Sequence, residues 1–224
     1  MKYIITGTSS GLGYEISKKL LTKGDIIGIS RTLGKAKLFE NSKSFSHVKF
    51  NLDNISNKFL YNQLITNLKK KIKNEKITLI LNASIFYLGD NRLSYNKTNK
   101  LFNINVFSLS QLIESLTDLN LCRIFVINSI SGIIGQENQH EYVASKHAVM
   151  GYIKSLIKSA KNKKFDVMCI NPGGIKTDLW KIYPNVKTNN FIEVDELARI
   201  CVSLISSKHK LFIENMNILP EADI

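Results

Sequence analysis

The sequence predicts an α/β protein with a doubly wound parallel β-sheet of about seven strands and helices on both faces. Short segments rich in β-branched residues alternate with longer segments of helical periodicity along all 224 residues. This order implies parallel strands, because a parallel connection needs a long crossover, usually a helix. No linker rich in Pro, Gly or Ser and no break in composition indicates a second domain, so we expect one domain over residues 1–224.

The predicted strands are short apolar segments bounded by turn residues. Ile, Val and Thr favour strands, and a strand that is buried on both faces of a sheet shows no regular polar alternation. These criteria predict strands at residues 2–6, 25–30, 48–51, 77–82, 123–128, 166–171 and 211–218.

The predicted helices each carry an apolar stripe. Leu12, Ile16 and Leu20 recur every four residues, which places them on one face of a helix directly after the first strand. Residues 60, 64, 68 and 72 repeat this spacing, and apolar stripes also predict helices over residues 101–119, 141–160 and 194–206.

Composition excludes several classes of protein. Hydrophobic residues make up 44% and charged residues 22% of the chain, ordinary values that exclude a disordered or fibrous protein. No apolar run approaches the length of a membrane span and we expect no signal peptide, so the predicted location is the cytoplasm, without membrane association. Cys122, Cys169 and Cys201 are odd in number and far apart, so we expect neither a disulfide framework nor a metal site.

The formal net charge of +13 is the one unusual bulk property. It could indicate an anionic partner, such as a nucleic acid or an acidic membrane surface. Much of the excess lies in lysine runs at residues 69–73 and 161–164, each at the end of a helical pattern, where cations are favoured by the helix dipole. We therefore expect no nucleic-acid partner.

A glycine-rich turn follows the first predicted strand. Residues 6–13 read Thr-Gly-Thr-Ser-Ser-Gly-Leu-Gly, and a helix begins there. Glycines permit a tight turn and close approach of the backbone to a ligand, while the N–H groups at the start of the helix can face a pyrophosphate. The residues expected to bind a dinucleotide here are Gly7, Ser9, Ser10, Gly11, Leu12 and Gly13.

Further motifs follow in chain order. Asn82-Ala83-Ser84 follows the fourth strand, Asn105 lies in the long helix, and Ser129 follows the fifth strand, with Tyr142 and Lys146 thirteen and seventeen residues later. Pro172-Gly173-Gly174-Ile175-Lys176-Thr177 follows the sixth strand. Together with the spacing TGxxxGxG, this series resembles the short-chain dehydrogenase/reductase superfamily in its single-domain, Rossmann-type form. The resemblance covers nearly the whole chain and weakens after Thr177. Ser84 stands where that family has a glycine.

The resemblance implies a catalytic tetrad of Asn105, Ser129, Tyr142 and Lys146. In the family roles, Tyr142 exchanges a proton with the substrate oxygen, Ser129 hydrogen-bonds that oxygen, Lys146 also holds the nicotinamide ribose, and Asn105 orders a water. Spacing independently places Tyr142 and Lys146 about one turn apart on one helix face, where the ammonium would lower the pKa of the phenol.

Two neighbouring residues are alternatives to tetrad members. Ser131 could replace Ser129 as the donor to the substrate, and Asn103 could replace Asn105. The family spacing favours Ser129 and Asn105.

The resemblance implies further cofactor contacts along the chain. Asn51 and Leu52 would hold the adenine, and the other implied contacts are Asn82, Ala83, Tyr142, Lys146, Pro172, Gly173, Ile175 and Thr177.

The end of the second strand predicts which nucleotide binds. NAD enzymes of this kind place a carboxylate there for the ribose hydroxyl, whereas this chain has Ser30-Arg31-Thr32. Arg31 can pair bidentately with a 2′-phosphate, and Ser30 and Thr32 can donate hydroxyl groups. We therefore expect NADP, in its reduced form NADPH, in preference to NAD.

The predicted function is an NADP-dependent oxidoreductase that reduces a small apolar or aromatic carbonyl compound, or oxidises the alcohol. This substrate class is suggested by apolar side chains on the loops that follow the strands, namely Phe86, Tyr87, Ile133, Ile134, Trp180, Ile182 and Tyr183. Like its relatives, the protein is expected to be a homodimer or homotetramer, paired through the helices around residues 101–119 and 141–160.

Two other functions share some of these sequence features. An epimerase or dehydratase acting on a nucleotide sugar uses the same Tyr and Lys, but such relatives typically carry a larger C-terminal domain. A non-enzymatic NADP-binding sensor would be expected to have lost Tyr142 or Lys146, and both are present.

Overall fold

Seven strands form the central sheet in the computed structural model, which describes residues 1–89, 92–160 and 164–220. All pairs are parallel, and the strand order is β3-β2-β1-β4-β5-β6-β9. The strands are β1 (Lys2–Thr6), β2 (Asp25–Ser30), β3 (Phe45–Lys49), β4 (Ile77–Leu81), β5 (Leu121–Ile127), β6 (Asp166–Pro172) and β9 (Ile213–Ile218). This confirms the doubly wound parallel sheet that the sequence predicts.

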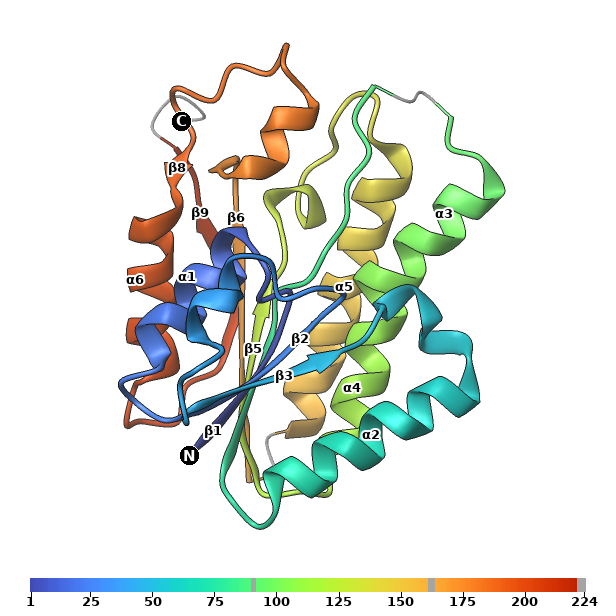
Figure 1. Ribbon diagram of the computed structural model, residues 1–224. Helices are drawn as coiled ribbons and strands as arrows, with labels where there is room; N and C mark the ends of the chain where they lie inside the picture. The colour runs from blue at the N-terminus through green and yellow to red at the C-terminus, as the bar shows by residue number, and fades with distance from the viewer. Residues whose placement is uncertain (90–91, 161–163, 221–224) are drawn as a thin grey trace.

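Helices cover both faces of the sheet, as the sequence predicts. Figure 1 shows α1 (Gly11–Leu20) and α6 (Val194–Ile205) on one side, and α2 (Lys58–Ile72), α4 (Ser108–Leu116) and α5 (His140–Ala160) on the other. Each face has its own apolar core, because successive strand residues point to opposite faces: Ile4 packs with α2, α4 and α5, whereas Ile5 packs with α1 and α6. The last turn of α2 carries the first lysine run, while residues 161–163 of the second run lie outside the described ranges.

Two local features differ from the sequence prediction. The helix expected over residues 101–119 is divided into α3 (Tyr95–Phe102), a π-helical turn at Asn103–Phe107, and α4. Beyond β6, the two-residue strands β7 (Ile175–Lys176) and β8 (Ile192–Glu193) pair in parallel as a separate small sheet. The π-helical turn and these two strands are too short to produce a periodic pattern in the sequence.

The strand order changes direction between β1 and β4. The chain runs outward from β1 to β2 and β3, then returns to β4 and continues through β5 and β6 to β9. In open parallel sheets, ligands bind at the carboxyl ends of the strands beside such a switch point. The glycine-rich turn after β1 and the Asn82 segment after β4 therefore meet where a dinucleotide is expected.

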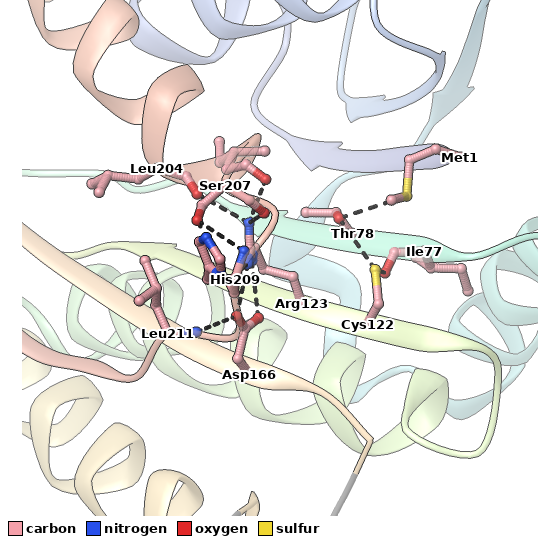
Figure 2. Close-up of polar contacts among 11 residues, drawn as sticks. Met1, Ile77, Thr78, Cys122, Arg123, Asp166, Leu204, Ser207, His209 and Leu211 are labelled. Carbon is pink, nitrogen blue, oxygen red and sulfur yellow. Dashed lines mark hydrogen bonds and ion pairs between the residues drawn. The ribbon is translucent and has the colours of Figure 1, made fainter.

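A buried ion pair stabilises the opposite, amino-terminal edge of the sheet. Arg123 on β5 donates to both carboxylate oxygens of Asp166 on β6, at 2.9 and 2.8 Å, and only 7% and 1% of these residues are exposed. The same guanidinium donates to the backbone carbonyls of Leu204, Ser207 and His209, as Figure 2 shows, and to that of Ile205. These carbonyls lie at and beyond the end of α6. Arg123 thus caps α6 and holds the chain that leads into β9.

No helix among the described residues is both long and apolar enough to cross a membrane.

Candidate active site

The glycine-rich turn after β1 has a backbone that only glycine fits well. Gly7 and Gly11 have φ angles of 78° and 56°, in the left-handed region that side chains disfavour. A Cβ atom on Gly13 would collide with the carbonyl oxygen of Gly7, so the start of α1 packs directly on the turn. Ser10, the N-cap of α1, makes no side-chain capping bond, and the first turn carries no carboxylate. The N–H groups at this end of the helix are therefore free to donate hydrogen bonds to an anion.

Asn82 fixes the turn from the neighbouring strand. Its side-chain amide donates to the backbone oxygens of Thr6 and Gly7, at 3.0 and 3.4 Å. The Thr6 hydroxyl in turn accepts from the backbone N–H groups of Asn82 and Ala83, both at 3.0 Å. The structure therefore places the NAG-like segment against the glycine-rich turn, and the side chain of Asn82 shapes that turn.

The end of β2 presents Arg31 and Thr32 at the surface beside this turn. The following chain is held to it by a bond from the Lys35 N–H to the Ser9 carbonyl, 2.8 Å long. The Ser30 hydroxyl has a different role from the one expected. It donates to the Thr32 carbonyl at 2.7 Å, so its only proton is already committed.

The residues expected near the adenine lie at the start of a 3₁₀ segment, Leu52–Ser56. The Asn51 side-chain oxygen accepts from the Asp53 N–H at 3.2 Å and so caps this segment, while Leu52 is buried.

Tyr142 and Lys146 lie one turn apart on α5, beside Ser129 at the end of β5. The hydroxyls of Ser129 and Ser84 lie near the Tyr142 phenol and act to lower its pKa. The Lys146 ammonium lies 5.6 Å from the centroid of the Tyr142 ring and 3.5 Å from the Asn128 carbonyl oxygen. The structure thus brings together three of the four predicted tetrad residues around the side chain of Tyr142.

Burial dominates the acid–base properties of this pair. It lowers the pKa of Lys146, of which 3% is exposed, to about 8. Burial also raises the pKa of Tyr142, although the hydroxyls of Ser129 and Ser84 act in the opposite direction. The net direction of the shift is thus set by desolvation, which keeps the phenol protonated.

The fourth residue, Asn105, lies in the π-helical turn and is almost fully buried. Its side-chain oxygen accepts from the Ile85 N–H at 2.9 Å and the Ser84 hydroxyl at 3.1 Å, and its amide donates to the Ile85 carbonyl and to Ser145. Asn105 therefore joins the loop after β4 to α5. Asn103 bonds Asp53 instead, away from the tetrad.

Ser84 is a member of the site that the sequence analysis did not assign. Its hydroxyl donates to Asn105 at 3.1 Å and lies near the Tyr142 phenol, so it stands between the two residues. The one sequence feature that could have indicated this role is that Ser84 replaces the glycine found at this position in the family.

A family model described as short chain dehydrogenase matches residues 2–186, which is most of the chain. The chain belongs to the short-chain dehydrogenase family. A 3-oxoacyl-[acyl-carrier-protein] reductase FabG from Buchnera aphidicola subsp. Schizaphis graminum is 32% identical over 186 residues, covering 80% of this chain and 75% of that protein. A protein of the same name from Chlamydia trachomatis is 28% identical over 221 residues, covering 94% of this chain and 88% of its own length.

Solved structures share the fold of this short-chain dehydrogenase. A mutant 4-hydroxyisoleucine dehydrogenase complexed with NADH and succinate superposes with a TM-score of 0.85 at 22% identity, covering 98% of this chain and 97% of that one. ElxO with NADP bound gives a TM-score of 0.81 at 20% identity, covering 97% and 96% of the two chains. The family and the Rossmann-type fold are thereby confirmed, and the chain is an oxidoreductase with an NAD(P)-binding fold.

The Pro-Gly segment of this short-chain dehydrogenase crosses from β6 towards the glycine-rich turn. The Gly173 N–H donates to the Ile218 carbonyl at 2.9 Å, and Ile175 pairs with Ile192 in the small sheet. A Cβ atom on Gly11 would lie 3.5 Å from the methyl group of Thr177, so the end of the segment lies directly against the turn.

The apolar residues expected around the substrate are only partly brought together. Phe86, Trp180 and Tyr183 gather beside Tyr142, with Phe86 in edge-to-face contact with the Tyr142 ring. Ile134 and Ile182 are mostly exposed, Ile133 packs against the core, and Tyr87 lies under the Lys97 ammonium.

Proposed function

We propose that this short-chain dehydrogenase reduces a carbonyl compound with NADPH, or oxidises the matching alcohol with NADP⁺, with Tyr142 as the acid and base. The observation that carries the proposal is the cluster of Ser129, Tyr142 and Lys146 at the carboxyl edge of the sheet, next to a glycine-rich turn that can accept an anion.

The proposed chemistry adds a hydride to the carbonyl carbon and a proton to its oxygen. The nicotinamide supplies the hydride when it is bound. Tyr142 donates its phenolic proton to the substrate oxygen, and Ser129 donates a hydrogen bond to the same atom. Lys146 stabilises the phenolate that remains, because an amine with a pKa of about 8 is mostly protonated at neutral pH. Asn105 holds the loop after β4, and with it Ser84, at the Tyr142 hydroxyl.

The cofactor proposal rests on the turn and on the end of β2. Gly7 and Gly13 allow the turn to pack closely against Asn82 and the start of α1, where a side chain would collide, and the uncapped start of α1 suits a diphosphate. Arg31 and Thr32 are exposed beside it, with a cation where an NAD enzyme has a carboxylate, which supports NADP over NAD. The other residues proposed to contact the cofactor are Ser9, Ser10, Leu12, Asn51, Leu52, Asn82, Ala83, Tyr142, Lys146, Pro172, Gly173, Ile175 and Thr177.

The proposed substrate is a small apolar or aromatic carbonyl compound, because aromatic rings line the space beside Tyr142. The relatives named 3-oxoacyl-[acyl-carrier-protein] reductase support a second candidate, a 3-oxoacyl group carried by an acyl-carrier protein. The net charge of +13 favours binding to a partner of net negative charge.

We further propose that α4 and α5 pair with a second copy of the chain to form a homodimer or homotetramer. A cytoplasmic location is proposed as well, since the three cysteines are free thiols, which suits a reducing compartment. Residues 1–224 would act as one NADP-binding domain.

The proposed function is tested by following NADPH oxidation with a panel of aldehydes, ketones, diketones and a 3-oxoacyl thioester. Turnover with a free ketone supports the first substrate class. Turnover confined to the thioester supports the second, and the absence of turnover with every carbonyl, despite measurable binding of NADPH, would refute the enzymatic proposal.

A further inference from the structure

Four aromatic rings, those of Phe86, Trp180, Tyr183 and Phe191, form a cluster that contacts Tyr142 through one member. The Phe86 centroid lies 5.1 Å from that of Tyr142, 5.7 Å from Trp180 and 5.6 Å from Tyr183, each pair meeting edge to face. Trp180 in turn contacts Phe191 at 5.0 Å. Phe86 is therefore the ring that joins the cluster to the proposed proton donor.

The rings come from two segments that are far apart in the sequence. Phe86 belongs to the loop after β4, whereas Trp180 and Tyr183 belong to the segment after β7, which includes the 3₁₀ turn Asp178–Ile182. Trp180 anchors this second segment, because its indole N–H donates to the Ile175 carbonyl at 2.7 Å.

The Tyr183 hydroxyl bonds the two segments together. It donates to the Phe86 carbonyl and accepts from the Leu88 N–H, both at 3.3 Å. A hydroxyl can do both at once, because it has one donor and two acceptor sites. The two bonds bracket Phe86 and Leu88, so they fix the part of the loop from which the Phe86 ring projects.

Tyr183 has no polar group to act on the substrate while both bonds are made. Its oxygen is engaged by backbone groups, and its ring contacts Phe86 and Trp180. The side chain therefore acts through Phe86, whose ring packs edge to face against the ring of Tyr142.

We propose that Tyr183 is a positioning residue that holds Phe86 against Tyr142 and so limits the width of the substrate beside its carbonyl group. The inference rests on the proposed function and adds a size rule to it. Carbonyl compounds that are flat or unbranched next to the carbonyl are accepted, whereas compounds with a branched or bulky substituent there are rejected by the Phe86 ring.

A Tyr183→Phe variant tests this, since it keeps the ring and removes both hydrogen bonds. Trp180 is the only tryptophan in the sequence, so its fluorescence reports on the cluster without any need for turnover. We expect the acrylamide quenching constant of Trp180 to rise about twofold or more as the two segments separate. The matched control is Tyr95→Phe, because Tyr95 is 79% exposed on α3, and its quenching constant should equal that of the unmutated protein.

The second measurement compares kcat/KM for an unbranched ketone and a branched analogue. In Tyr183→Phe the kcat/KM for the branched ketone, divided by that for the unbranched ketone, should rise about tenfold. A change of this size is expected for one or two lost hydrogen bonds. The kcat for the unbranched ketone should stay within about twofold, which a disrupted catalytic group would not allow.

The outcomes separate this proposal from the proposed function. Unchanged quenching in Tyr183→Phe overturns the linking role of the hydroxyl, whether or not the protein is active. Increased quenching with an unchanged substrate ratio overturns the size rule. A protein that turns over no carbonyl compound refutes the proposed function and, with it, the size rule, while the quenching result still decides whether Tyr183 holds the cluster.

Discussion

The Lys146 ammonium lies 5.6 Å from the centroid of the Tyr142 ring, yet the pKa of that phenol is raised and not lowered. Lys146 is buried and Tyr142 is partly buried, and desolvation disfavours the phenolate as well as the ammonium. The site therefore holds Tyr142 protonated, which is the form required to donate a proton to a carbonyl oxygen. Removing the Tyr142 hydroxyl should therefore lower the rate of catalysis, whereas removing the Lys146 charge should raise the stability of the fold.

Replacing Tyr142 with Phe should lower kcat for NADPH-dependent reduction by about 10²- to 10⁴-fold, the usual contribution of a general acid. The Kd of NADPH should stay within about twofold, because the ring and its contact with Phe86 remain. Steady-state kinetics and titration calorimetry measure the two quantities. Ser131→Ala is the control, since the Ser131 hydroxyl bonds Gln136 at 3.1 Å, and it should keep full turnover. Substantial activity in Tyr142→Phe would remove Tyr142 from the mechanism.

Lys146→Met should stabilise the protein at neutral pH. Burial depresses the pKa of Lys146 from 10.5 to about 8, so below pH 8 the folded state carries a buried charge at a cost of about 3 kcal/mol. Between pH 8 and 10.5 the folded state releases this proton first, and the cost disappears as the pH rises. The Tm advantage of Lys146→Met should therefore be several degrees at pH 7 and fade by about pH 10. A constant advantage across this range would show that packing, and not charge, causes it.

Gly13→Ala should damage the turn after β1. Its Cβ would collide with the Gly7 carbonyl oxygen, and such overpacking typically costs about 1–3 kcal/mol. The Kd of NADPH should rise about tenfold or more, because the turn must move. Gly151→Ala on α5 is the matched control, since its Cβ would meet nothing within 4 Å. It should stabilise the helix by about 0.5–1 kcal/mol and leave the Kd unchanged. Equal effects of the two variants on binding would mean that the turn does not bind the cofactor.

Arg123→Met should destabilise the protein by about 3–5 kcal/mol, because it leaves Asp166 charged and buried without a partner. Several carbonyls at the end of α6 would lose their donor as well (Figure 2). Urea unfolding measures the change. Arg199→Met is the control, since Arg199 pairs with Asp195 on the exposed face of α6, and the expected loss is at most about 1 kcal/mol. A loss this small in Arg123→Met would contradict a structural role for the buried pair.

The sequence was sufficient to predict the sheet and the order of its elements, because each buried parallel strand is an apolar run and each helix carries one apolar stripe. At the sheet edge the prediction was less accurate: β3 spans Phe45–Lys49, whereas the expected strand began at Val48. An edge strand is partly exposed, so its residues mix apolar and polar side chains, and its limits depend on pairing with β2.

Within the site, the sequence predicted residues whose spacing along one helix or turn determines their geometry. Tyr142 and Lys146 are one turn apart on α5 for that reason. The Ser84 hydroxyl at Tyr142 and the Tyr183 hydroxyl at Phe86 could not be predicted, because each contact joins loops from different parts of the chain. The effect of burial on the pKa of Tyr142 likewise depends on the folded structure and not on spacing.

Arg31→Ala should remove the preference for NADPH without affecting NADH. An exposed guanidinium at the end of β2 can make a charge-assisted bidentate contact with the 2′-phosphate, typically contributing about 1.5–3 kcal/mol, so the Kd of NADPH should rise roughly 10- to 150-fold. NADH lacks this phosphate, and its Kd should change by less than about twofold. Titration calorimetry with both nucleotides measures the four constants. Lys23→Ala controls for net charge, because Lys23 is exposed just before the start of β2, at the opposite end of that strand, and it should alter neither Kd. If the unmutated protein binds NADH as tightly as NADPH, or if Arg31→Ala weakens both equally, Arg31 does not contact the phosphate and the proposed choice of NADP is wrong.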